Sequence, residues 1–301
     1  MTLTVRAPAK INLHLGVGAP RPDGFHPLTS VYQAVGVYDD LRIADSDGWS
    51  VDVTVADWMD RSHVPLAGDN IVDRAAALLA AHHGLAATGE VHIAKEIPVA
   101  GGMAGGSADA AAALVGLDRL WDAHTSDTDL LALAAHLVSD VPFSLVGGTA
   151  LGTGRGEIVE PVSDRGTWWW VLVPSTDGGL STPEIYRHFD RLSPDAPAVP
   201  PMPDALLAAL DAGDPHALAA ALHHDLQPAA LDLRPDLAGL LGAGESAGAL
   251  RGVVTGSGPT CVFLCESAEA ARAVATDLRA SYDVVLVANG AVSGAHAVTY
   301  A

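Results

Sequence analysis

Residues 98–109 read Pro98-Val-Ala-Gly-Gly-Met-Ala-Gly-Gly-Ser-Ala-Asp109. The segment before them, 90–95, predicts a strand, and the Ala- and Leu-rich segment 110–122 after them predicts a helix. A glycine-rich loop between a strand and a helix can turn successive backbone N–H groups toward phosphates, and the positive end of the helix dipole strengthens the attraction. The stretch therefore predicts a phosphate-binding loop in a fold that mixes helices and strands.

Two common nucleotide-binding motifs do not fit this loop. Gly101 and Gly106 have P-loop spacing, but Ser107 follows directly where that motif needs a lysine. A dinucleotide-binding unit needs an acidic residue about 20 positions further on, at the end of a second strand, and this sequence predicts helix there. A glycine turn that only lets strand and helix pack together stays an alternative. Asp109, in the first helical turn, is interpreted as structural, or at most as lying near the phosphate acceptor.

The remaining periodicity divides the chain into two halves. In the first half, strands are predicted at 4–17, 29–37, 40–44 and 50–55, helices at 70–83 and 127–138, and two short strands up to 159. In the second half, the prediction gives a strand at 168–173, helices at 204–211, 215–223 and 268–281, a strand pair around 256–258 and a strand at 283–288. At 301 residues, the chain is long enough for two cores. We predict an α+β architecture with domains 1–162 and 163–301.

Composition narrows the class of protein. Hydrophobic residues make up 49% and charged residues 17%, which predicts a compact globular protein. The formal net charge of −20 disfavours binding to nucleic acid or to an anionic membrane. No apolar run reaches the roughly 18 residues of a membrane span, and the first residues lack the pattern of a secretory signal. The sequence therefore predicts a cytoplasmic protein.

Cysteines and adjacent histidines are interpreted as structural. Cys261 and Cys265 lie four positions apart in a predicted strand, too far for an unstrained disulfide, so we expect buried, inert thiols. The pairs His82-His83 and His223-His224 place neighbouring rings in different directions, so neither pair predicts a metal site.

Two charged residues are candidates for catalysis. The sixteen basic residues are fourteen Arg and only two Lys, Lys10 and Lys95. Asp140 follows a predicted helix and precedes Val-Pro-Phe, a position from which its carboxylate could point into a cleft. Phosphoryl transfer to an alcohol can use a base for the hydroxyl proton and a cation beside the oxygen, and Lys10 is the candidate cation. A surface or capping role stays an alternative for each residue.

Ring-bearing residues suggest how an acceptor could be held. Phe25 and His26 follow the turn Arg21-Pro-Asp-Gly24, and Tyr186 lies in the segment 181–186. Two aromatic faces could hold a nucleobase between them while an imidazole reads its edge. Ordinary packing of these rings is the alternative.

Three motifs, in this order, resemble those of the GHMP kinases. The first is Ala7-Pro-Ala-Lys-Ile-Asn-Leu-His-Leu-Gly16, extended by Arg21-Pro-Asp-Gly-Phe-His26; the second is 98–109; the third is Val254-Thr-Gly-Ser-Gly-Pro-Thr260. Any single glycine motif is weak. The first motif, with its Asp-Gly-aromatic-His extension, resembles the corresponding motif of those family members that act on a cytidine-diphosphate-linked methylerythritol.

The resemblance implies a two-domain α+β fold: an N-terminal domain like ribosomal protein S5 domain 2 and a ferredoxin-like C-terminal domain, with the active site between them. It implies a small-molecule kinase of isoprenoid synthesis, monomeric or dimeric, that uses ATP with Mg²⁺. Lys10 and Asp140 would be the catalytic pair, with Asp140 as base. The residues implied to contact ATP are Lys95, on the adenine side, and Pro98, Val99, Ala100, Gly101, Gly102, Met103, Ala104, Gly105, Gly106, Ser107 and Ala108. The residues implied to contact the acceptor are Asn12, Phe25, His26, Tyr186, Gly256, Ser257 and Gly258.

The loop departs from the resemblance at two positions. Ala100 and Ala104 stand where the family commonly has glycine, and a Cβ atom disfavours positive φ there. Three rival functions remain open at this point: another GHMP kinase acting on homoserine or mevalonate, a binding or sensor protein of the same fold without catalysis, and an unrelated dinucleotide-binding protein.

Overall fold

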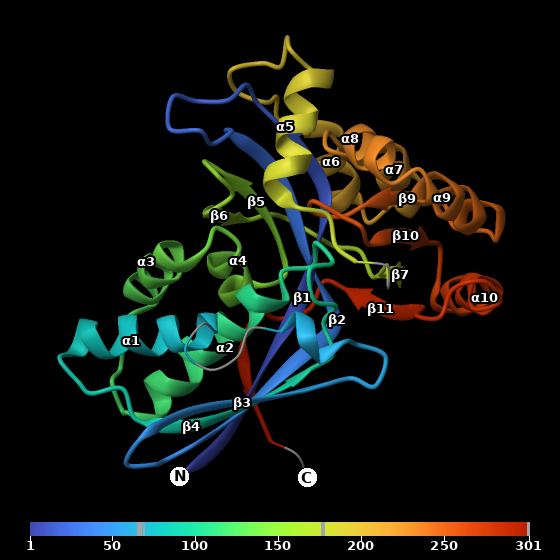
Figure 1. Cartoon of the computed structure of the whole chain (residues 1–301). Helices are drawn as coiled ribbons and strands as arrows, with labels where there is room; N and C mark the ends of the chain where they lie inside the picture. Colours follow the sequence, from blue (N-terminus) through green and yellow to red (C-terminus); the bar gives the residue numbers. More distant parts are fainter. Residues whose placement is uncertain (65–67, 69, 176–177, 300–301) are drawn as a thin grey trace.

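The computed structural model describes residues 1–64, 68, 70–175 and 178–299 (Figure 1). Within these residues, twelve strands form one sheet, and helices cover it in two groups. The prediction of a mixed α and β fold is confirmed. Among the described helices, none has the length and apolar character needed to cross a bilayer.

The sheet is organised by two long antiparallel strands, β1 (Thr2–Val17) and β2 (Leu28–Ala44). The connection between them contains the predicted turn, in which the Gly24 N–H donates to the Arg21 carbonyl at 2.9 Å. β2 continues through the point where we predicted a break between two strands. Both strands are buried along most of their length, and several of their buried side chains are polar, among them Lys10, Asn12 and Gln33.

The rest of the N-terminal half extends this pair. β4 (Gly89–Lys95) pairs with one end of β2 and with β3 (Trp49–Val55), whereas β5 (Thr149–Thr153) pairs with the other end of β2 and with β6 (Ile158–Pro161). The helices of this half, together on the left of Figure 1, are α1 (Ile71–His83), α2 (Gly105–Leu120), α3 (Asp127–Leu137) and α4 (Val141–Val146).

The Ala-rich α2 lies directly against β1 and β2 because its buried face carries small side chains. A Cβ atom on Gly116 would lie 2.2 Å from Cδ1 of Ile43, so glycine permits the close approach. The helix begins at Gly105, five residues before its predicted start, and α4 was not predicted at all.

The C-terminal half continues the same sheet. β7 (Trp168–Val173) lies between β11 (Leu286–Gly290) and β10 (Cys261–Cys265), which pairs in turn with β9 (Arg251–Val254). Two short strands, β8 (His223–His224) and β12 (His296–Val298), pair with β1 instead. The helices of this half are α5 (Thr182–Leu192), α6 (Asp204–Ala212), α7 (Pro215–Ala221), α8 (Gln227–Leu233), α9 (Asp236–Ser246) and α10 (Ala268–Leu278).

The two halves are thus joined by strand pairing as well as by packing. The helices α5, α8 and α9 and the strands β8 and β12 were not predicted; β8 and β12 are too short to leave a periodic pattern. The boundary between 162 and 163 stays a prediction. Cys261 and Cys265 are both buried as free thiols on β10, as expected.

The glycine-rich loop carries the least expected backbone. Ala100 has φ 55° and Ala104 has φ 59°, so both alanines adopt the left-handed conformation that their Cβ atoms disfavour. Ala104 directly precedes α2 and has no side-chain oxygen to cap it. The left-handed conformation costs a non-glycine residue roughly 1–2 kcal/mol, which the surrounding packing must offset.

Replacing Ala104 with glycine is therefore expected to stabilise the protein by about 0.5–1 kcal/mol, because relief of the left-handed strain exceeds glycine's larger loss of entropy. The matched control is Ala110→Gly in the interior of α2, which should destabilise by about 1 kcal/mol or more. Urea unfolding of both variants measures the two changes. Equal destabilisation by the two substitutions would contradict the left-handed conformation at residue 104.

Candidate active site

Lys10 and Asn12 project from the same face of β1, because side chains alternate along a strand. Lys10 Nζ donates to Asn12 Oδ1 at 2.8 Å, and both side chains are buried. The Asn12 amide donates in turn to Ser30 Oγ at 2.8 Å. This network holds the ammonium group of Lys10 in a fixed direction.

Asp140 approaches Lys10 from the turn before α4. Its carboxylate lies 3.6 Å from Lys10 Nζ, and more than a quarter of its side chain, 28%, is exposed. The ring of Tyr32 also lies near the ammonium group. The distance from Lys10 Nζ to the centroid of this ring is 5.4 Å. Burial, with a further contribution from the charge of Asp140, raises the pKa of Tyr32, so this phenol stays neutral. The two predicted catalytic residues are therefore brought together, although 130 positions separate them in the sequence.

The third motif closes the site from the C-terminal half. The Gly256 N–H donates to Asn12 Oδ1 at 3.1 Å, and the Asn12 N–H donates to Thr255 Oγ1 at 3.0 Å. Ser257 Oγ lies 3.0 Å from Thr182 Oγ1, at the start of α5. The segment between β9 and β10 thereby connects β1 to α5.

Glycines let the second and third motifs touch. A Cβ atom on Gly102 would lie 2.3 Å from the Thr255 carbonyl oxygen, and one on Gly256 would lie 2.5 Å from the Gly102 carbonyl oxygen. The Lys10 N–H also donates to the Met103 carbonyl at 3.1 Å, which fixes the loop to β1. The loop is consequently placed by backbone contacts that side chains would block.

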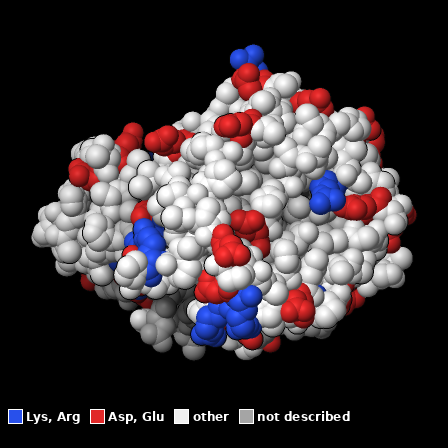
Figure 2. All heavy atoms as spheres, turned by 90° about the horizontal axis from the view of Figure 1, so that it is seen from above, with Lys and Arg blue, Asp and Glu red and all other residues white. Residues whose placement is uncertain are grey.

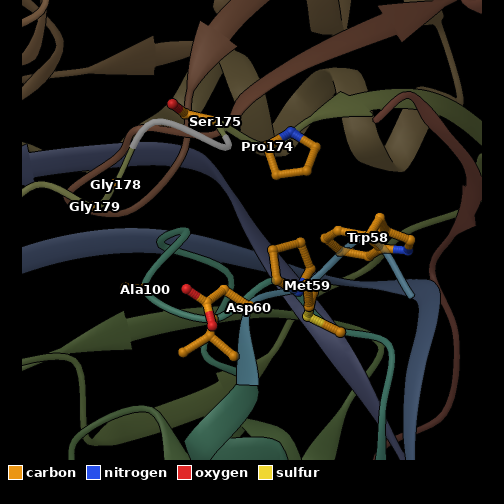
Figure 3. Close-up of a pocket in the computed structure, with 10 residues that line it drawn as sticks. Trp58, Met59, Asp60, Ala100, Pro174, Ser175, Gly178 and Gly179 are labelled. Atoms are coloured by element: carbon orange, nitrogen blue, oxygen red, sulfur yellow. The ribbon is translucent and has the colours of Figure 1, made fainter. Parts of the chain in front are cut away.

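Three hollows meet at the glycine-rich loop. The first, of about 310 Å³, lies between the loop and residues of the second half; Figure 3 shows Trp58, Met59 and Asp60 on one side of it and Pro174 and Ser175 on the other. The second, of about 370 Å³, is bordered by the loop, the start of α2, Asn70 and Lys95. The third, of about 340 Å³, is lined by Lys10, Asn12, Tyr32, Ala100, Gly102, Ala104, Asp140, Arg155, Tyr186, Gly256 and Ser257, among others.

Lys95 is held in an ion-pair network at the edge of the second hollow. Its Nζ donates to Asp39 Oδ2 and to Asp109 Oδ2, both at 2.6 Å, and all three side chains are buried. Burial opposes the charged form, but the two carboxylates outweigh it and raise the pKa of Lys95. Asp39 also accepts the N–H groups of Glu96 and Ile97, whereas burial raises the pKa of Asp109. This network supports the structural interpretation of Asp109, and a contact between Lys95 and adenine stays a prediction.

The predicted ring residues occupy two different places. His26 and Tyr186 are in contact, with ring centroids 5.0 Å apart, and His26 Nδ1 lies 2.7 Å from the Gly18 carbonyl. Burial and the nearby charge of Asp140 raise the pKa of Tyr186. Phe25 is half exposed, at 51%, and lies under the guanidinium group of Arg155 rather than against Tyr186.

Sequence analysis missed several residues of the third hollow, among them the polar side chains of Tyr32 and Arg155. Tyr32 lies inside a predicted strand, and no motif in the sequence around it indicates a functional role. Arg155 lies between two glycines, Gly154 and Gly156, and this pattern of an arginine presented by a tight turn was available in the sequence. The described residues contain no group of three or more His, Cys, Asp or Glu side chains placed to hold a metal ion.

Comparisons with known proteins identify the family of the chain. The profile described as GHMP kinases N terminal domain matches residues 70–148, and the one described as GHMP kinases C terminal matches residues 206–284. Two relatives are each named 4-diphosphocytidyl-2-C-methyl-D-erythritol kinase. The one from Nocardioides sp. is 71% identical over 99% of this chain and 100% of its own. The one from Thermobifida fusca is 52% identical over 99% of this chain and 98% of its own.

Solved structures are similar over almost the whole chain. A crystal structure of 4-(cytidine 5'-diphospho)-2C-methyl-D-erythritol kinase superposes with a TM-score of 0.78 at 28% identity, covering 96% of this chain and 98% of the other. A homoserine kinase from Cytophaga hutchinsonii has a TM-score of 0.75 at 20% identity, covering 99% and 97%, which shows a shared fold alone. The two profiles match the chain in the order of their domains, and the two relatives are 71% and 52% identical to it over nearly its full length. The chain therefore belongs to the GHMP kinase family.

Proposed function

We propose that this protein phosphorylates the 2-hydroxyl of 4-diphosphocytidyl-2-C-methyl-D-erythritol with ATP, giving the 2-phosphate and ADP. The observation that carries the proposal is the Lys10–Asp140 pair, 3.6 Å apart, in a hollow that also borders the glycine-rich loop. The names of the relatives at 71% and 52% identity support this choice of acceptor.

Asp140 would act as the base. The acceptor oxygen attacks the γ-phosphorus, the bond from that phosphorus to the oxygen of ADP breaks, and the hydroxyl proton passes to the Asp140 carboxylate. Lys10 would orient the hydroxyl and stabilise the negative charge that develops on its oxygen. Asn12 holds the Lys10 ammonium group in place, so this stabilisation needs little rearrangement during the reaction.

ATP would be held by the loop, Pro98 to Ala108, with its phosphates at the start of α2. The first turn of α2 is suited to an anion because its N–H groups point toward the loop and no side chain of Ala104 competes for them. The first and second hollows, on either side of Val99 and Ala100, offer space for the rest of the nucleotide.

Mg²⁺ would travel with the ATP phosphates. This ion prefers oxygen ligands and keeps several waters, and the loop offers one such oxygen in the Ser107 hydroxyl, which borders the second hollow. When bound, the ion would neutralise part of the charge on the phosphates.

The acceptor would lie in the third hollow, across the two halves. Its reacting hydroxyl would lie at Lys10 and Asp140, with Asn12, Gly256, Ser257 and Gly258 along one side. Its cytosine would lie near Phe25, His26 and Tyr186, where His26 can read polar atoms of the base. In this arrangement residues 1–162 supply the catalytic pair and the phosphate-binding loop, and residues 163–301 line one side of the first hollow and complete the acceptor side.

Removing either catalytic group should abolish most turnover. Asp140→Asn is expected to lower kcat by about 10²–10⁴-fold, because the amide cannot accept the hydroxyl proton. Lys10→Ala should also lower kcat strongly. ADP release with saturating substrates measures both, and the exposed Asp47→Asn, which removes the same charge elsewhere, is the control. Full activity of Asp140→Asn would exclude the carboxylate as base.

The cytidyl group should contribute strongly to acceptor recognition. We expect kcat/KM to fall by about 10–100-fold or more when the acceptor lacks it, since stacking on aromatic rings stabilises a bound base. Homoserine and mevalonate should give no turnover under the same conditions. ADP release with each compound is the measurement. If homoserine or mevalonate were phosphorylated as fast as the cytidyl acceptor, the chain would have the activity of another member of the family.

A further inference from the structure

Arg155 lies at the tip of the hairpin between β5 and β6, and the fold fixes this tip. Gly154 and Gly156 have φ of 72° and 100°, and the Gly156 N–H donates to the Thr153 carbonyl at 2.9 Å. The Leu28 N–H donates to the Gly154 carbonyl at 2.9 Å, which ties the turn to the start of β2. A Cβ atom on residue 156 would lie 2.3 Å from the Tyr32 hydroxyl, so the turn also packs against a residue of the third hollow.

The neighbours of the Arg155 guanidinium leave it available to a ligand. Its Cζ lies 4.8 Å from the centroid of the Phe25 ring, within the range of cation–π contact. Two acidic residues act on it: Glu157 Oε1 is 3.7 Å from Arg155 Nε, too far for a hydrogen bond, and Asp23 interacts with it through charge alone. Glu157 Oε2 instead accepts the backbone N–H of Arg155 and so stabilises the turn. The guanidinium therefore borders the third hollow, and no side chain or carbonyl of the described residues accepts a hydrogen bond from it.

Positive charge is scarce in this molecule, so its position carries information. Figure 2 shows acidic side chains spread over the face seen from above, with basic side chains at only a few places. Of the residues that line the third hollow, the basic ones are Lys10 and Arg155. Lys10 is engaged by Asn12 and Asp140 at the reacting end. Arg155 is left as the cation near Phe25, the end assigned to the cytosine.

We propose that Arg155 binds the diphosphate of the acceptor and is a determinant of its recognition. The inference rests on the proposed function, because it takes the acceptor to be a nucleoside diphosphate. The planar guanidinium matches two phosphate oxygens at once, and stacking on Phe25 orients that plane. The diphosphate joins the base to the polyol, so a cation beside the base site and in the same hollow as Lys10 is suitably placed to meet it.

Calorimetric titration of the full-length protein with CDP and with cytidine separates the roles of charge and packing. Arg155→Gln is expected to weaken CDP binding by about 10–100-fold, the range for loss of hydrogen bonds to a charged group, and to leave cytidine binding unchanged. Arg155→Lys should recover part of the CDP affinity. In turnover assays, Arg155→Gln should raise KM for the acceptor while kcat and KM for ATP stay near the wild-type values. The control is Arg165→Gln, which removes an exposed cation outside the hollow.

The outcomes distinguish this inference from the proposed function. If the wild type turns over the cytidyl acceptor and Arg155→Gln binds CDP as tightly as the wild type, the inference fails and the function stands. Equal loss of CDP and cytidine affinity would also overturn it, because the arginine would then act only by holding Phe25. A wild type that neither binds CDP nor turns over the acceptor would overturn both.

Discussion

The carboxamide of Asn12 is the point on which the active site depends. Its oxygen accepts hydrogen bonds from Lys10 and from the backbone of Gly256, which is 244 positions away, and its nitrogen donates to Ser30 on the neighbouring strand. A buried amide with this many partners is costly to leave unsatisfied, so each partner is constrained by the others. One side chain therefore fixes the direction of the Lys10 ammonium group and, at the same time, connects the C-terminal half to the N-terminal half.

Close backbone contact supplies the second constraint. Gly102 and Gly256 approach so nearly that neither could carry a side chain, and the loop that reaches this contact passes through two alanines at positive φ. Packing at the contact thus holds the loop in a conformation that its own sequence disfavours. Such strain is typical of segments that must be ready for a ligand before it arrives. The buried Lys95 network, directly behind the loop, adds rigidity at the same place.

Sequence could predict the class of the fold and propose residues for the candidate site, because both follow from local patterns. The loop before α2, the strand with Lys10 and Asn12, and the turn before Phe25 each have a chemical signature that needs no partner. The missing parts depend on distant contacts. The sequence around Lys95 does not predict its ion pairs with Asp39 and Asp109, since Asp39 is 56 positions away. Phe25 and Tyr186 stay a predicted clamp for a nucleobase, but the sequence did not show that Arg155, 130 positions away, lies over the Phe25 ring. The positive φ of Ala100 and Ala104 could not be predicted because a Cβ atom disfavours that conformation.

The pairing of β12 with β1 has a consequence for how the protein is made. Thr4 lies opposite Val298, so this part of β1 waits for a strand 294 positions further along the chain before its edge is covered. β11 likewise joins β2 to β7 late in synthesis. The N-terminal half therefore cannot complete its sheet as an independent unit during translation, and the edge of β1 is open to pairing with other chains until β12 has been made. Long-range closure of this kind is slow, so this edge stays exposed for longer than the edge of a sheet built from neighbouring strands.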